Sequence, residues 1–245
     1  MQHTGTNMEV SHWKRLFLIG GAAPVMTLAI YLSQWLIIAL TGEAYPITPE
    51  EWFAFFEHGK LLGLIYLNAF DVFSIAILGL MFLALYVALK RTHPPLMAVA
   101  AFFMFLGVAV FVSSHSDAAS AMLTLSDQYT TVVSEAGRSQ ILAAGEAVLV
   151  STRATPETIG FFFIAFGSLT TSFVILRNKA FSRGIAYIGS LAFLLTLAND
   201  ISLVFAPSIT PMLMPLNGFL WLIWWILIGR KLLQLGSVKA KESYE

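Results

Sequence analysis

Three aspartates lie in stretches of the chain that are otherwise almost wholly apolar. They are Asp71 in LNAFDVFSIAIL, Asp117 in FVSSHSDAASAML and Asp200 in FLLTLANDISLVF. An ionisable side chain inside a membrane span is energetically costly, so such a residue normally faces a partner, a water-filled cavity or a ligand. A carboxylate in that setting can bind a cation, accept hydrogen bonds or act as an acid or base. The three aspartates are therefore the first candidates for function.

The composition indicates that these residues belong to a membrane protein. Hydrophobic residues make up 58% of the 245 residues, charged residues only 11%, and the mean hydropathy is +0.77. Six apolar runs are long enough to cross a hydrocarbon core, which takes about 20 helical residues. They cover residues 16–40, 61–89, 96–123, 158–176, 184–206 and 212–229. We expect an all-α bundle of six transmembrane helices in a single domain.

The basic residues predict the orientation of the spans. If successive spans alternate in direction, most lysines and arginines fall on one side, and only Lys60, Arg138 and Arg153 fall on the other. Loops rich in lysine and arginine stay in the cytoplasm. Both termini are therefore expected to be cytoplasmic, in a plasma or inner cell membrane. No basic run is dense enough to predict binding of nucleic acid.

Two outer connections have the pattern of amphipathic helices. Thr48, Pro49 and Glu51 form a helix-start signature, with a cap, a proline at the first helical position and a glutamate that completes a capping box. Between residues 134 and 151, apolar side chains and one glycine recur at helical spacing. These are Ile141, Leu142, Gly145, Val148 and Leu149. Residues 155–157, Thr-Pro-Glu, repeat the start signature before the fourth span.

The polar residues inside the spans are predicted to lie at a similar depth. At a rise of 1.5 Å per residue, Asp71, Asp117 and Asp200 lie about 26 to 33 Å from the cytoplasmic ends of their helices. The same count puts Gln34 at about 28 Å and Asn217 at about 20 Å. The polar residues of five helices therefore converge in the outer part of the bilayer.

Helical spacing groups these residues into stripes. Asn68, Asp71 and Ser74 follow one another at steps of three and share a face. The third span has a narrow stripe of Ser113, Ser116, Asp117, Ser120 and Thr124, and the fifth span groups Thr196, Asn199 and Asp200. We expect these stripes to face the bundle interior and to form an outward-opening polar pocket. The predicted ligand-binding residues are Gln34, Asn68, Asp71, Ser74, Ser113, Asp117, Ser120, Asn199, Asp200 and Asn217.

The histidines give little support to metal chemistry. His115 is two residues from Asp117, which is about 200° around a helix, so the two side chains should point apart. We interpret His115 as a packing histidine; the alternative is a metal site formed by His58, His115 and an aspartate. No HxxxH, HxxE or HExxH spacing, no cysteine and no GxSxG motif is present. We expect no cofactor and do not favour an enzyme.

Parts of the chain resemble a known family. The segments ALYVALKRTHPPLMAVAAFF and RNKAFSRGIAYIGSLAFLL, with the polar third span and the amphipathic helix after it, resemble a widespread family of small bacterial integral membrane proteins described only as a domain of unknown function. This resemblance implies a six-helix membrane protein and transfers no catalytic residue.

Three functions remain open. The first is a pocket that binds or transports a small polar or cationic ligand or a lipid headgroup, with the outer helices as a lid and Arg138 and Arg153 as possible counter-charges. The second is an accessory subunit that docks another membrane protein through its polar outer face and the WFAFF segment. The third is a membrane-embedded hydrolase, with or without a metal. For each aspartate, interhelical hydrogen bonding without further function is the structural alternative.

Overall fold

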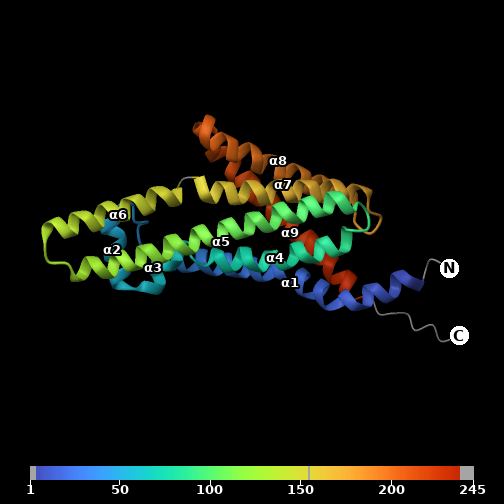
Figure 1. Cartoon of the computed structure of the whole chain (residues 1–245), viewed down its shortest axis with the longest axis horizontal. Helices are drawn as coiled ribbons and strands as arrows, with labels where there is room; N and C mark the ends of the chain where they lie inside the picture. Colours follow the sequence, from blue (N-terminus) through green and yellow to red (C-terminus); the bar gives the residue numbers. More distant parts are fainter. Residues whose placement is uncertain (1–3, 154, 238–245) are drawn as a thin grey trace. The chain divides into compact units, whose positions relative to one another are not determined.

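The computed structural model describes residues 4–153 and 155–237, and every regular element in that part of the chain is a helix (Figure 1). The all-α prediction is confirmed. The helices are α1 (Thr4–Thr41), α2 (Pro49–His58), α3 (Lys60–Tyr66), α4 (Asp71–Leu89), α5 (Pro94–Thr131), α6 (Glu135–Arg153), α7 (Thr155–Arg177), α8 (Arg183–Phe205), the 3-10 turn η1 (Pro207–Ile209) and α9 (Thr210–Ser237).

Within the described residues, six segments are long and apolar enough to cross a membrane, as predicted. They are Trp13–Thr41, Asp71–Leu89, Pro94–Thr131, Thr158–Arg177, Arg183–Leu203 and Pro207–Ser237. Large apolar side chains on them are exposed, among them Trp35, Phe102 and Phe219. Apolar surface of this extent is unfavourable in water and suits the hydrocarbon of a bilayer. The protein is a multi-pass integral membrane protein.

The chain divides into two compact units. Unit 1 comprises Met1–Leu28, Ile77–Leu106 and Phe162–Glu245, and unit 2 comprises Ala29–Ala76 and Gly107–Phe161. Helices α1, α4, α5 and α7 each contribute residues to both units.

Small residues allow close helix packing in unit 1. Gly189 of α8 lies against Trp224 of α9 and Ser172 of α7, and a Cβ at this glycine would collide with both side chains. Trp224 is fully buried and Trp225 is 4% exposed. Both rings therefore pack inside unit 1 and do not face lipid, and Gly189 provides the space in which the Trp224 ring is buried.

Unit 2 is built around an aromatic core that includes α2. This core comprises Trp52, Phe53, Phe56, Tyr66, Met122 and Leu149. The predicted capping box at the start of α2 is confirmed: Glu51 N donates to Thr48 Oγ1 (3.3 Å), and the Glu51 carboxylate accepts from Thr48 N (3.3 Å). A bond from Ile47 N (2.6 Å) adds to this, and the two backbone donors lower the pKa of Glu51.

The second amphipathic helix is also present as predicted. On α6, Leu149 and Gly145 are buried, and Ile141, Leu142 and Val148 pack against the aromatic core. Gly145 lies against Phe53 and Pro49 of α2, so its small size lets α6 approach α2 closely. Glu135, Arg138 and Glu146 are exposed, as the helical spacing predicted.

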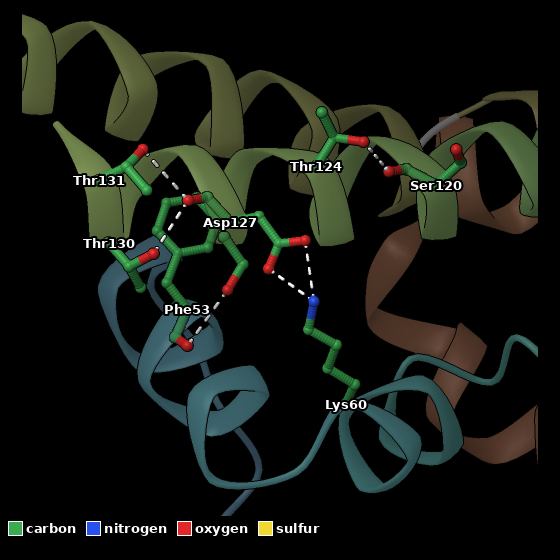
Figure 2. A network of polar contacts seen from close by, with 8 residues as sticks. Phe53, Lys60, Ser120, Thr124, Asp127, Thr130 and Thr131 are labelled. Atoms are coloured by element: carbon green, nitrogen blue, oxygen red, sulfur yellow. Dashed lines mark hydrogen bonds and ion pairs between the residues drawn. The ribbon is translucent and has the colours of Figure 1, made fainter.

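A set of polar contacts connects α2 and α3 with α5 (Figure 2). Lys60, the first residue of α3, forms an ion pair with Asp127 of α5, with Nζ to Oδ1 at 2.7 Å. On the same helix, Ser126 donates to the Phe53 carbonyl of α2 at 3.4 Å. Both side chains of the ion pair are about 60% exposed. An exposed pair of this kind contributes at most about 1 kcal/mol, so the aromatic core is the main support of this region.

The helix expected over residues 61–89 is interrupted. Helix α3 ends at Tyr66 and α4 begins at Asp71, and Asn68 between them has a φ of 57°. Asn68 N donates to Ile65 O (3.1 Å) and Ala69 N to Leu64 O (3.0 Å). These are the two bonds of a Schellman motif, which ends a helix at a residue in the left-handed conformation. Asn68 is a non-glycine residue that tolerates this conformation.

Candidate functional site

The structure divides the ten predicted ligand-binding residues into two sets. Unit 2 contains the larger set: Gln34, Asn68, Asp71, Ser74, Ser113, Asp117 and Ser120. Unit 1 contains Asn199, Asp200 and Asn217.

In unit 2, Gln34 and Asp71 are in direct contact. Gln34 Nε2 donates to Asp71 Oδ1 at 2.9 Å. Gln34 is 4% exposed, whereas Asp71 is half-buried at the first residue of α4. Ser74 lies one turn further along α4, is fully buried and donates to the Phe70 carbonyl at 3.4 Å. Gln34 on α1 thus contacts Asp71, which was predicted to lie at a similar depth in the bilayer.

Asn68 does not share the helical face of Asp71 and Ser74. The expected spacing required a continuous helix through residues 68–74, but Asn68 lies in the break between α3 and α4 and is exposed. Its role in the structure is to terminate α3.

The polar stripe of α5 also differs from the expectation. Ser113, Ser116, Asp117, Ser120 and Thr124 have the predicted helical spacing, but all five are exposed instead of facing the bundle interior. The buried face of the same helix segment is formed by apolar residues, namely Phe111, Ala118, Ala119 and Met122. Burial of this apolar face determines the rotation of α5 and leaves the hydroxyl stripe on the opposite side.

A groove with a volume of about 700 Å³ lies along part of this stripe. Its lining residues come from α5 and the last turns of α6: Ala109, Val110, Ser113, Ser114, His115, Asp117, Ala118, Ala121, Val148 and Ser151. Among them, Asp117 is the residue with a formal negative charge. The volume falls in the range of small-molecule sites. The groove therefore combines one carboxylate and three serine hydroxyls with alanine and valine walls.

Two of these serine hydroxyls already donate their hydrogen to a backbone carbonyl. Ser114 Oγ donates to Phe111 O at 3.0 Å, and Ser151 Oγ donates to Val148 O at 2.7 Å. A hydroxyl whose hydrogen is committed in this way remains an acceptor through its lone pairs. With Asp117, the groove is consequently rich in hydrogen-bond acceptors.

The histidines are in different settings. The ring of His115 stacks on that of Phe111, with centroids 4.0 Å apart and planes at 18°. His115 nevertheless lines the same groove as Asp117, although the two side chains were expected to point apart. His58 is exposed at the end of α2, where its Nδ1 lies 2.7 Å from Ala54 O. Within the described chain, no group of three histidine, cysteine or acidic residues is arranged to hold a metal ion.

Arg138, one of the two arginines expected to act as counter-charges, makes other contacts. The guanidinium of Arg138 lies over the ring of Tyr129, at 5.8 Å from its centroid, and Arg138 Nε donates to Val132 O. The side chain of Arg153 and those of residues 155–157 lie outside the described residues.

In unit 1, the predicted residues border a hydrogen-bonded contact between α8 and α9. Thr196 Oγ1 accepts a hydrogen bond from Trp221 Nε1 (2.8 Å) and donates one to Asn217 Oδ1 (2.9 Å). Ser202 and Thr210 are joined at 2.9 Å. Asp200 is 7% exposed, and its Oδ2 has no hydrogen-bond partner among the described residues. Asn217 thus takes part in the hydrogen-bonded contact between α8 and α9.

A family model described as "Domain of unknown function (DUF4386)" matches residues 57–229, which is well over half of the chain. The protein belongs to the DUF4386 family. Neither the curated proteins nor the solved structures contain a match. The predicted resemblance to an uncharacterised membrane family is confirmed.

In this DUF4386 protein, Ser114 and Ser151 were missed as groove residues. Ser114 is adjacent to the predicted stripe but one position off its spacing, and Ser151 lies on a different helix. The sequence contains no signal that Ser151 lines the groove, because this depends on where the end of α6 packs against α5.

Proposed function

We propose that this DUF4386 protein binds an amphiphilic cation, either an amine-headed lipid or a free alkylammonium compound, in the groove between α5 and α6. The observation that carries the proposal is the chemistry of the lining. Asp117 supplies a negative charge, and Ser114 and Ser151 offer acceptor oxygens because their hydrogens are committed to backbone carbonyls.

This lining favours a donor with a positive charge. An ammonium group or protonated amine provides the charge that complements a carboxylate, and charge-assisted hydrogen bonds are about twice as strong as neutral ones. An anionic headgroup would meet a carboxylate and committed hydroxyls, which repel it. The proposed specificity is therefore for cations over anions of the same size.

The apolar part of the lining supports an amphiphile. Ala109, Val110, Ala118, Ala121 and Val148 present methyl groups beside the polar side chains. Burial of an alkyl chain against such a surface is favourable by about 0.8 kcal/mol per methylene. The groove also lies on a membrane-spanning helix, where the bilayer itself is a source of amphiphiles.

The test uses thermal unfolding of the purified protein in an uncharged detergent. Three probes separate the contributions: decyltrimethylammonium, decyl sulfate with the same chain and the opposite charge, and tetramethylammonium with no chain. We expect a saturable rise in Tm with decyltrimethylammonium, a smaller one with tetramethylammonium and none with decyl sulfate. A rise with phosphatidylethanolamine, but not with decyltrimethylammonium, would assign the site to a lipid and not to a free cation.

Matched variants locate the effect. Asp117→Asn keeps the shape of the side chain and should weaken the apparent affinity about tenfold, the equivalent of one charge-assisted hydrogen bond. Glu146→Gln removes an exposed negative charge from α6 outside the groove and should bind like the wild-type protein. Equal stabilisation by decyl sulfate, or an unchanged response in Asp117→Asn, would contradict the proposal.

A further inference from the structure

A second polar site lies in unit 2 at the break between α3 and α4. Asp71 is the first residue of α4, so its carboxylate lies at the positive end of the dipole of a 19-residue helix. The amide of Gln34 donates to Oδ1 of the same carboxylate. Both interactions direct partial positive charge at the carboxylate. An ionised carboxylate within a membrane span is normally paired with a counter-charge.

Gln34 gives an independent indication that a ligand belongs here. It is 4% exposed, and its Oε1 is buried without a hydrogen-bond partner among the described residues, while the Nε2 of the same amide is bound to Asp71. A buried carbonyl oxygen without a donor is costly. Exchange of the amide's oxygen and nitrogen would place Oε1 against an ionised carboxylate, which is repulsive, so the hydrogen bond from Nε2 to Asp71 sets the orientation of the amide.

The backbone carbonyls at the break between α3 and α4 already accept hydrogen bonds. The carbonyl oxygens of Asn68, Ala69 and Phe70 each accept a backbone N–H, from Asp71, Val72 and Phe73 respectively. Each of these carbonyl oxygens therefore already has one donor, whereas the buried Gln34 Oε1 has none among the described residues.

We propose that the Asp71 carboxylate and Gln34 Oε1 bind a monovalent metal cation of the sodium class. Oxygen ligands suit a hard cation, and the two residues supply one formal negative charge and one neutral carbonyl. A single positive charge neutralises Asp71, whereas a divalent ion would leave an excess positive charge in an apolar region. The site is separate from the groove on α5 and does not depend on the function proposed for it.

The experiment measures Tm of the full-length protein in an uncharged detergent while NaCl replaces choline chloride at constant ionic strength and pH. We expect a saturable rise in Tm with Na⁺ that is absent with choline. Asp71→Asn should lose this rise, and Gln34→Leu should weaken the apparent affinity for Na⁺ about tenfold. Asp117→Asn, which alters the groove alone, should keep the full response to Na⁺.

Binding of radiolabelled Na⁺ to the wild-type protein tests the proposal even if a variant fails to fold. We expect binding of about one ion per chain, competed by unlabelled Na⁺ and not by choline. Absence of Na⁺ binding, a Tm that depends on pH but not on Na⁺, or a Na⁺ response that survives in folded Asp71→Asn would each overturn the site.

Discussion

The side-chain amide of Gln34 on α1 donates a 2.9 Å hydrogen bond to the carboxylate of Asp71, the first residue of α4, 37 positions further along the chain. The bond lies within unit 2 and connects a buried polar residue of one membrane span to the start of the next. Hydrogen bonds to a charged acceptor are stronger than those between neutral groups, especially away from water. The pair therefore couples the folding of α1 to the point at which α4 begins.

Replacement of Gln34 by leucine tests that coupling. Leucine fills a similar volume without a donor, so Asp71 loses its partner, and we expect a loss of about 1.5 to 3 kcal/mol in the free energy of unfolding. A double-mutant cycle with Asp71→Asn, measured by denaturation in mixed detergent micelles, should give a coupling energy above about 0.5 kcal/mol. Additive effects of the two substitutions would show that the bond contributes nothing.

Asn68 is predicted to be replaceable by glycine but not by a β-branched residue. Its φ of 57° places it in the left-handed region, where a residue with a Cβ is disfavoured by about 1 to 2 kcal/mol. Asn68→Val should lower the free energy of unfolding by about that amount, whereas Asn68→Gly should be neutral or slightly stabilising. Thermal unfolding of both variants distinguishes this from a role in ligand binding, because loss of a ligand contact would affect both equally.

Thr196 is predicted to stabilise the contact between α8 and α9 through its hydroxyl. Thr196→Val keeps the shape but removes the acceptor of Trp221 Nε1 and the donor to Asn217. We expect a loss of about 1 to 2 kcal/mol in stability, with Thr196→Ser close to the wild-type protein. Tryptophan fluorescence during unfolding is a suitable measurement. If serine and valine destabilise equally, the methyl group and not the hydroxyl is responsible.

Features encoded by neighbouring residues were predictable from the sequence. The capping box of α2 depends on Thr48 and Glu51, three positions apart, and the apolar face of α6 depends on spacing within five turns. The membrane spans follow from the sum of apolar side chains over about 20 residues, so their presence did not depend on packing.

Features set by contacts between distant residues were not predictable. The break at residues 67–70 lies in an apolar run, and its one local signal is Asn68. Asparagine tolerates the left-handed conformation found there, but it is also common in polar stripes of helices. The rotation of α5 depends on which of its faces packs, and its buried side is formed by Phe111, Ala118 and Met122. Burial of Trp224 depends on the space at Gly189, 35 positions away.

The contact between Gly189 and Trp224 can be tested with two matched glycine substitutions in unit 1. Gly189→Ala places a methyl group against Trp224 and Ser172, and we expect a loss of about 1 to 3 kcal/mol in stability from overpacking. Gly218→Ala on α9 meets no atom within 4 Å and should be neutral, or stabilising by up to about 1 kcal/mol through higher helix propensity. Thermal unfolding of the two variants checks the difference, and a similar effect of both would contradict the packing at Gly189.

The capping box of α2 predicts a dependence of stability on pH. The pKa of Glu51 is lowered in the folded protein because its carboxylate accepts from Ile47 N and Thr48 N. A group with a lowered folded pKa stabilises the fold above its unfolded pKa, and this contribution is lost as the pH falls through the folded value. The Tm of the wild-type protein should therefore exceed that of Glu51→Gln at neutral pH, and the difference should shrink below about pH 4.

Glu50→Gln is the control for this pH dependence, because Glu50 lies in the same first turn of α2 and is not part of the capping box. It shares the favourable interaction of an acidic residue with the helix N-terminus, which is general to the first turn. Subtraction of its effect therefore isolates the two backbone hydrogen bonds of Glu51. Identical pH profiles for Glu50→Gln and Glu51→Gln would assign the whole effect to the helix dipole and leave no contribution from the capping box.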